Sequence, residues 1–300
     1  MYLASHVRKT LPDTSPWARF ADRVLTEAIG ASAASNPKNK EPSRVAELLE
    51  DLGGSRQPDL LSARNDLHRT IQDTALMILA DNASLSAGEI ETLALCVAVE
   101  ADVRRQRLVG WLHDDPAATR ISLDLLGRLL GKEHPGAITV GSGSGLARAA
   151  LLDVDTTGPW GARGIRMEPA VMWALAGEAR PDPELPDLTR FETASNKTGD
   201  KYPLVFVTGP DRTRRRRTAG NHLTGDQFLV VPPETSENPW RAVVREATLR
   251  GAGVCIEAVD DLPAAARHWI ERAAHIPWAV TSEHEIAITA LPDRTWRAFH

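Results

Sequence analysis

A run of arginines follows an apolar segment at a place where a loop between a strand and a helix could bind phosphate. Residues 204–217 read LVFVTGPDRTRRRR, so the apolar run ends just before Gly209. In a P-loop, G-x-x-x-x-G-K-[ST], the second glycine lets the backbone wrap the phosphates, the lysine contacts the β and γ phosphates, and the hydroxyl binds Mg²⁺. Here Arg214, Arg215 and Arg216 hold those three places. The pattern predicts an ATPase-type loop without its own hydrolytic groups.

Two polar residues further along the chain stand where a nucleotide hydrolase of this class carries chemistry. Glu257 follows the apolar run GVCI, where an acidic side chain would hold Mg²⁺, and Thr281 follows WAV, where a polar side chain would sense the γ-phosphate. The carboxylate that polarises the attacking water is missing unless Asp260 or Asp261 supplies it. The alternative interpretation is that Glu257 and Thr281 only terminate strands.

The arginine run has interpretations besides a damaged nucleotide site. It would attract an anion, an acidic partner or RNA, or it would be a solvated surface loop. Residues 212–220 contain Ala219 as their only aliphatic side chain, so we expect no helix there that buries a face. The candidate nucleotide-binding residues are Gly209, Pro210, Asp211, Thr213, Arg215, Glu257 and Thr281, and the candidate anion- or partner-binding residues are Arg212, Arg214, Arg216 and Arg217.

The elements around this loop predict a parallel sheet covered on both faces, because short apolar runs alternate with amphipathic helices. The expected strands are 204–207, 228–231, 253–256, 278–281 and 286–290, and the expected helices are 238–249 and 262–274. The preceding stretch, 181–201, has the proline-rich, polar composition of a linker.

The region before the linker predicts helices followed by a short extended element, which is the order of a winged-helix domain. Ser86 and Glu89 form a capping box, and we expect Thr119 to cap a helix that ends before Gly131. A strand is expected at 164–167 and a helix at 169–176. As a DNA-recognition helix, 119–130 offers Arg120 and Arg128 against Asp124, which favours protein docking over DNA binding. The glycine-rich segment 141–145 lacks the last glycine of a dinucleotide loop, so a flexible linker is the preferred interpretation.

The composition is that of an ordinary globular protein. The 300 residues carry a net charge of -5, 42% hydrophobic and 25% charged residues, and no charge excess typical of a nucleic-acid-binding protein. Cys96 and Cys255 stand in apolar runs and are expected to be buried thiols in a reducing compartment. Residues 1–20 contain no continuous apolar segment, so we expect no secretory signal, and no apolar run of about eighteen residues occurs; we therefore expect a cytoplasmic protein without membrane partners. The histidines are scattered and no Cys-x-x-Cys occurs, so no metal site is expected. Further helices are expected at 15–30, 43–52 and 67–79.

From about Ser86 onward the chain resembles the N-terminal half of the AAA+ ATPases encoded with bacterial extracellular contractile injection systems. The likeness rests on the capped helix, the segment WLHDD at 111–115, the winged-helix-like segment and the strand leading into GPD at 209–211. In that family a winged-helix-like domain precedes a degenerate first ATPase module, and an intact second module follows. The resemblance implies that 209–211 match the start of the loop, that Arg215 replaces the lysine, and that Glu257 is the acid of the third strand. No counterpart of the intact module is present, so we expect a fragment or a shortened relative.

Together these expectations give a mixed fold: an N-terminal α-helical and winged-helix-like region followed by an α/β, P-loop NTPase-like (AAA-type) parallel-sheet domain. The expected parts are 1–84 (helical), 85–180 (winged-helix-like), 181–201 (linker) and 202–300 (degenerate NTPase-like). The leading hypothesis is an ATPase-like assembly or docking protein that works with other proteins of a contractile injection system, or with copies of itself, without catalytic residues. ATP or ADP with Mg²⁺ is the only cofactor the resemblance suggests. The alternatives are a winged-helix nucleic-acid-binding regulator and an active ATPase with an arginine-substituted P-loop.

Overall fold

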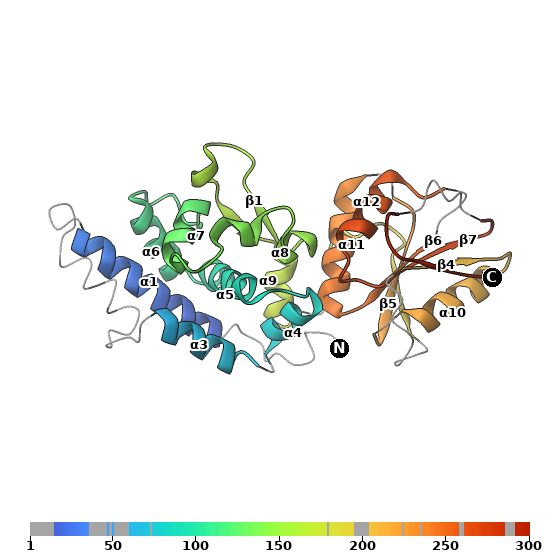
Figure 1. Cartoon of the computed structure of the whole chain (residues 1–300), viewed down its shortest axis with the longest axis horizontal. Coiled ribbons are helices and arrows are strands. Elements are labelled where there is room, and N and C mark those ends of the chain that lie inside the picture. The colour runs from blue at the N-terminus through green and yellow to red at the C-terminus, as the bar shows by residue number, and fades with distance from the viewer. Residues whose placement is uncertain are drawn as a thin grey trace.

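The chain folds into an elongated molecule with a helical lobe at one end and an α/β lobe at the other (Figure 1). The computed structural model describes residues 15–35, 47, 50, 60–72, 74–178, 180–194, 204–223, 225–234, 236–257, 261–285 and 292–300. The helix expected at 43–52 lies almost wholly outside the described residues, and the strand expected at 286–290 lies entirely outside them. None of the described helices is long and apolar enough to cross a membrane.

The helical lobe is built around α5, which is buried along most of its length. Its elements are α1 (Pro16–Ser35), α3 (Leu60–Thr70), α4 (Ala75–Asn82), α5 (Ala87–Ala101), α6 (Val103–His113), α7 (Leu123–Leu130), η2 (Gly136–Val140), α8 (Gly145–Arg148), β1 (Leu152–Val154), η3 (Trp160–Ala162), β2 (Ile165–Met167) and α9 (Pro169–Leu175). Strands β1 and β2 form an antiparallel hairpin. A single apolar core joins side chains from α1 through α9, so it extends across the predicted boundary at residue 84.

Local sequence signals predicted some of the element boundaries in this lobe correctly. The capping box of Ser86 and Glu89 is confirmed at the start of α5, as are the strand at 164–167 and the helix at 169–176. The expected cap at Thr119 is wrong: α7 begins three residues later, because the Ser122 hydroxyl accepts a hydrogen bond from the Leu125 amide at 3.2 Å.

Two other helix bounds also differ from the expectation. The helix expected at 67–79 is two helices, because α3 ends at Thr70 and Thr74 caps α4. Helix α1 continues past Gly30 to Ser35, since a glycine on an exposed helix surface costs only about 1 kcal/mol relative to alanine.

The α/β lobe contains the predicted parallel sheet. Its elements are β3 (Arg190–Thr193), β4 (Leu204–Thr208), α10 (Arg212–His222), β5 (Gln227–Val231), α11 (Glu237–Arg250), β6 (Gly253–Glu257), α12 (Ala264–Arg272), β7 (Trp278–Ser282) and β8 (Arg297–Phe299). The strand order is β3-β5-β6-β7-β4-β8, with only β3 antiparallel to its neighbour. Residues 181–201, expected to be a linker, therefore contribute an edge strand, β3.

Helices cover both faces of the sheet. Helices α11 and α12 lie on the face toward the helical lobe, and α10 lies on the opposite face (Figure 1). The buried thiols of Cys96 and Cys255 belong to the helical core and to the core under α10, and burial raises the pKa of each to about 12. Both cysteines are therefore packing residues rather than nucleophiles.

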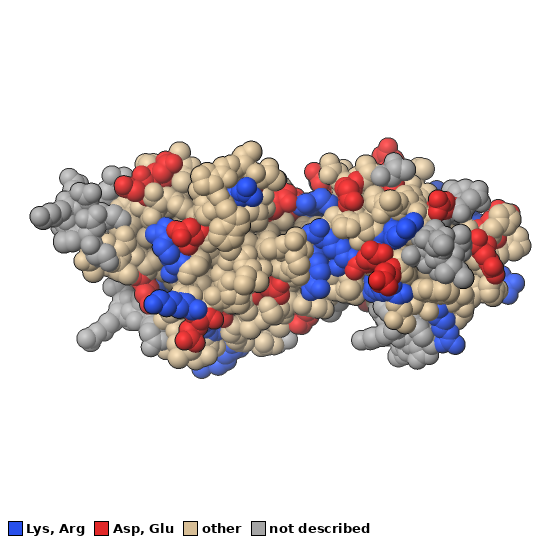
Figure 2. All heavy atoms as spheres, turned by 45° about the horizontal axis from the view of Figure 1, so that its top comes forward, with Lys and Arg blue, Asp and Glu red and all other residues tan. Residues whose placement is uncertain are grey.

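The two lobes meet along α11, which contacts α4 and α9 of the helical lobe. The Asn82 side chain donates a hydrogen bond to the Thr248 carbonyl at 2.9 Å, and Arg241 of α11 pairs with Asp153 and with Glu168 of the helical lobe. Figure 2 shows charged side chains of both signs gathered over this junction. The junction therefore combines apolar contacts with a polar network.

Candidate functional site

The loop between β4 and α10 is too short to wrap a phosphate chain. Only Gly209, Pro210 and Asp211 separate the strand from the helix, and Gly209 has a φ of 144°, a backbone conformation that favours glycine. Arg214, which stands at the second-glycine place of the P-loop pattern, lies inside α10. The loop therefore keeps the start of the expected motif but not its phosphate-wrapping half.

The amide groups at the start of α10 are already occupied by a side chain of the protein. The Asp211 carboxylate accepts hydrogen bonds from the Thr213 amide at 2.8 Å and from the Arg214 amide at 3.0 Å. These two hydrogen bonds lower the pKa of Asp211, so the carboxylate is charged at neutral pH. A phosphate at a helix N-terminus would bind to these same amide groups, so the Asp211 carboxylate occupies the place that a phosphate would take.

Arg215, at the place of the P-loop lysine, turns back onto the loop. One of its terminal nitrogens donates a hydrogen bond to the Gly209 carbonyl, and among the described residues nothing accepts from its buried Nε. The guanidinium thus closes the loop on itself. It does not replace a lysine that reaches outward to β and γ phosphates.

Glu257, the candidate Mg²⁺ ligand, is held by two arginines of α10. Arg212 Nε donates to its Oε1 at 3.1 Å and Arg216 Nη2 donates to its Oε2 at 2.9 Å; Arg216 also pairs with Glu192 of β3 at 3.3 Å. Burial acts to raise the pKa of Glu257, but the hydrogen bonds from Arg216 and Arg212 outweigh it and lower the pKa to about 2. Both carboxylate oxygens are therefore engaged by cations of the protein itself.

Thr281 lies at the expected end of β7, but its hydroxyl is not directed at a ligand. It is 2% exposed and donates to the Ile256 carbonyl at 3.3 Å. The register places Thr281 opposite Glu257, and Ser282 opposite Thr208, so β7 lies between the loop strand and the acid-bearing strand. The sheet thus brings the predicted positions to one edge, although their side chains bind one another or the backbone. Among the described residues, no group of three His, Cys, Asp or Glu side chains is arranged to hold a metal ion.

The expectation that 212–220 forms no packed helix is wrong, as is the interpretation of the arginine run as a surface loop. Helix α10 packs on the sheet through Ala219 and Gly220, and a Cβ at Gly220 would lie 2.8 Å from the Phe228 ring. The absence of a side chain at this position lets the helix approach the sheet closely. Arg214 and Arg217 remain exposed on the outer surface of α10.

Sequence reasoning missed how these groups pair with one another. Aspartate directly before a helix is a favoured cap, and Arg212 and Arg216 are four residues apart, on one side of a helix. These signals could have predicted a capped helix with two guanidinium groups facing the same partner. They could not have named Glu257 as that partner, because it comes from a strand 41 residues after Arg216.

Two alternative sites in the helical lobe receive little support. In α7, the proposed recognition helix, the leucines are buried in the core and Arg128 pairs with Asp124 at 3.0 Å. In the segment 141–145, the Gly145 amide donates to the buried carboxylate of Glu89, so an internal anion again occupies the group that a phosphate would use.

The Glu257 cluster predicts a specific dependence of stability on pH. Since the pKa of Glu257 is lowered from 4.5 to about 2, its stabilising effect is complete above about pH 5 and is lost as the pH falls from about 4.5 toward 2. Glu257→Gln is expected to lower the free energy of unfolding at pH 7 by about 1–2 kcal/mol, after allowance for solvent screening of a partly exposed group. Urea unfolding of both proteins between pH 7 and pH 3 measures this difference, which should shrink in acid.

The matched control is Glu27→Gln on the exposed surface of α1, which should keep the wild-type dependence on pH. A constant difference between Glu257→Gln and the wild type across this pH range would contradict the assigned charge pairing.

No family model, curated protein or solved structure matches the chain. Function is therefore inferred from the geometry of the loop, of the Glu257 cluster and of the sheet.

Proposed function

We propose that this chain is an ATPase-like assembly or docking protein with a degenerate nucleotide site that does not hydrolyse ATP. We further propose that it acts in a contractile injection system, as the resemblance to the first, degenerate module of the associated AAA+ ATPases implies. In this proposal the helical lobe supplies the winged-helix-like part, and the work is done in the cytoplasm through contacts with other proteins of the system.

The sheet supports the proposal of an NTPase-like ancestry. The strand that leads into the loop, β4, lies between β7 and β8, and β7 separates it from β6 with Glu257 at its end. Thr281, the proposed γ-phosphate sensor, stands on β7, which is the strand beside the loop strand β4. The residues proposed for a nucleotide site therefore lie at the carboxyl edge of the sheet, where ligands of parallel α/β sheets bind.

The main observation that supports the absence of hydrolysis is that side chains of the protein itself already bind the groups that would hold phosphate and Mg²⁺. Asp211 holds the amides at the start of α10, and Arg212 and Arg216 hold Glu257. A bound nucleotide would have to break these charge-assisted hydrogen bonds, which are among the stronger ones in proteins. It would gain no lysine or magnesium-binding hydroxyl at the P-loop positions in return.

The enzymatic test uses the purified chain with labelled ATP and Mg²⁺. We expect no phosphate release above the background of protein-free buffer and no saturable binding of Mg-ATP by calorimetry, because the anion and metal positions are filled. Hydrolysis that disappears in Arg215→Ala would overturn the proposal and support the alternative of an active ATPase.

The cellular test uses the organism that encodes the chain. Deletion of the gene is expected to reduce assembled contractile particles, counted by electron microscopy, and a copy carrying Arg215→Ala is expected to restore them. Unchanged particles after deletion would contradict the role in assembly, whereas failure of only the Arg215→Ala copy would indicate that this residue has a required role.

A further inference from the structure

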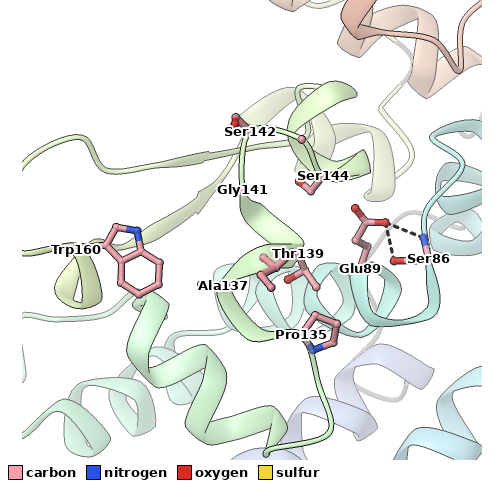
Figure 3. A pocket seen from close by; sticks show the side chains of 11 residues that line it. Ser86, Glu89, Pro135, Ala137, Thr139, Gly141, Ser142, Ser144 and Trp160 are labelled. Atoms are coloured by element: carbon pink, nitrogen blue, oxygen red, sulfur yellow. Dashed lines mark hydrogen bonds between the residues drawn. The ribbon is translucent and has the colours of Figure 1, made fainter.

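A groove in the helical lobe lies outside the candidate nucleotide site. It has a volume of about 840 Å³, within the usual range of ligand sites, and it runs along η2 between the start of α5 and the loop that carries Trp160. In Figure 3, Trp160 lies at one end and Glu89 at the other, with Ala137 and Thr139 between them. The groove therefore has two chemically different ends.

The end at Glu89 holds a buried carboxylate that pairs with no cation among the described residues. Glu89 is 8% exposed, and among the described residues its carboxylate contacts only neutral donors. Oε2 accepts from the Ser86 amide at 2.8 Å and from the Ser86 hydroxyl at 2.7 Å, while Oε1 accepts from the Gly145 amide. A carboxylate offers about four acceptor positions, so Oε1 retains one for a further donor.

The backbone beside this carboxylate is arranged to let it approach. A Cβ at Gly145 would lie 3.3 Å from both Glu89 oxygens and 2.8 Å from Leu85 Cδ2, so only glycine fits there without displacing its neighbours. The Ser144 hydroxyl caps α8 by accepting from the Ala147 amide at 3.1 Å, which fixes the loop over the carboxylate. Glu89 is thus held in one place rather than left free at the surface.

Away from Glu89 and the hydroxyls of Thr139, Ser142 and Ser144, the groove is lined by apolar side chains, two of which are large and exposed. Ile138 is 76% exposed and Trp160 is 62% exposed, and Pro135 and Ala137 also line the groove. Figure 2 shows a largely uncharged surface over the middle of the helical lobe. Such walls suit a hydrocarbon chain, and an indole face also attracts a cation.

We propose that this groove binds an alkylammonium group, with the ammonium at Glu89 Oε1 and the hydrocarbon stem along Pro135, Ile138 and Trp160. A lysine side chain and a small aliphatic amine share this chemistry. An ammonium supplies the donor that Oε1 lacks and neutralises a buried charge, which a neutral alcohol of the same length does not do. This proposal does not depend on the proposed function.

The test compares four probes by NMR titration of the ¹⁵N-labelled chain, with hexylamine against hexanol and the blocked peptide Ala-Lys-Ala against Ala-norleucine-Ala. We expect the two cationic probes to shift the amide signals of Ser142, Gly143 and Gly145, with affinities at least about tenfold higher than those of their neutral partners. Tighter binding of the peptide than of hexylamine assigns the groove to a partner protein, and the reverse assigns it to a small amine. Equal binding of cationic and neutral probes, or shifts confined to other regions, would overturn the proposal.

Two variants locate the binding energy. Glu89→Gln keeps a residue type that capping boxes accept but removes the charge, and it should weaken hexylamine binding about tenfold or more. Trp160→Ala should weaken both hexylamine and hexanol, and Trp173→Ala, which removes an equally exposed indole from α9, should weaken neither. Because a glutamine side chain accepts from only one side, Glu89→Gln is first checked for a folded spectrum. If it fails to fold, Trp160→Ala and the probe comparison on the unaltered chain still decide the outcome, and unchanged affinity in Trp160→Ala would contradict the site.

Discussion

Replacing Arg245 with alanine is expected to lower the free energy of unfolding by about 3–5 kcal/mol, because it leaves buried carboxylates without their cation. The Arg245 side chain is 2% exposed and contacts three acidic groups: Asp182 at 2.6 Å, Glu184 at 2.9 Å and Glu168 at 3.2 Å. The Asp182 side chain is 1% exposed, so the substitution leaves a buried carboxylate without its cationic partner. Urea unfolding at pH 7, followed by circular dichroism, measures the change in midpoint.

The matched control removes an arginine whose ion pair is in solvent. Arg180 pairs with Glu178 at 3.8 Å and its side chain is 86% exposed, so Arg180→Ala should change stability by less than about 0.5 kcal/mol. Arg245→Lys should fall between the two, because an ammonium keeps the charge but lacks the planar fork that reaches several carboxylates at once. A loss below about 1 kcal/mol for Arg245→Ala would show that the network does not hold this region together.

The ion pairs of Arg245 help to join the two lobes, and the sequence did not predict them. Arg245 and Arg241 are one turn apart on α11, and Glu168 forms an ion pair with each of them, although it comes from the helical lobe. Burial raises the pKa of Glu168, while the charge of Arg245 acts in the opposite direction. Residues 182 and 184 stand in a stretch with the composition of a linker, and composition does not show that their carboxylates return to α11.

The four central strands, in contrast, could be predicted from the sequence. The apolar runs that became β4, β5, β6 and β7 were recognisable because strands buried on both faces are continuously apolar. Strand β3 was missed because its residues RFET form an edge strand with exposed and half-buried side chains and lack this pattern. Short β8, with sequence RAF, gave no pattern long enough to recognise.

In the candidate site, the positions of the residues could be predicted from the sequence, but their side-chain contacts could not. The positions of Gly209, Glu257 and Thr281 at one edge of the sheet follow from the parallel direction of their strands, which alternating strands and helices predict. The contacts that fill the site depend on which side chains meet across the sheet, and the spacing of residues in the chain carries no record of them. Helix α10 is the clearest example: its arginine run suggested a solvated loop, but Arg212 and Arg216 pair with Glu257, and Arg216 also pairs with Glu192.

Trp278→Ala is expected to be comparable in effect to Arg245→Ala, lowering the free energy of unfolding by about 3–5 kcal/mol, for a different physical reason. Trp278 begins β7 in the middle of the sheet, is fully buried, and packs near Trp240 of α11 with ring centroids 6.2 Å apart. Its indole nitrogen also donates to the Ala273 carbonyl at 3.2 Å, so the change creates a cavity and leaves a buried carbonyl without this donor. Differential scanning calorimetry and urea unfolding both measure the loss.

The chain offers a matched control in Trp173, which has the same side chain but is 64% exposed on α9. Trp173→Ala should change the free energy of unfolding by less than about 0.5 kcal/mol, because the lost indole is already largely in water. Since β7 lies between β4 and β6, loosening it should also disturb the approach of Arg212 to Glu257 across the sheet edge. The Trp278→Ala protein should therefore lose part of the acid-dependent stability assigned to Glu257, whereas Trp173→Ala should keep all of it. An unaltered acid dependence in Trp278→Ala would show that the α10 arginines and Glu257 are positioned independently of the packing beneath β7.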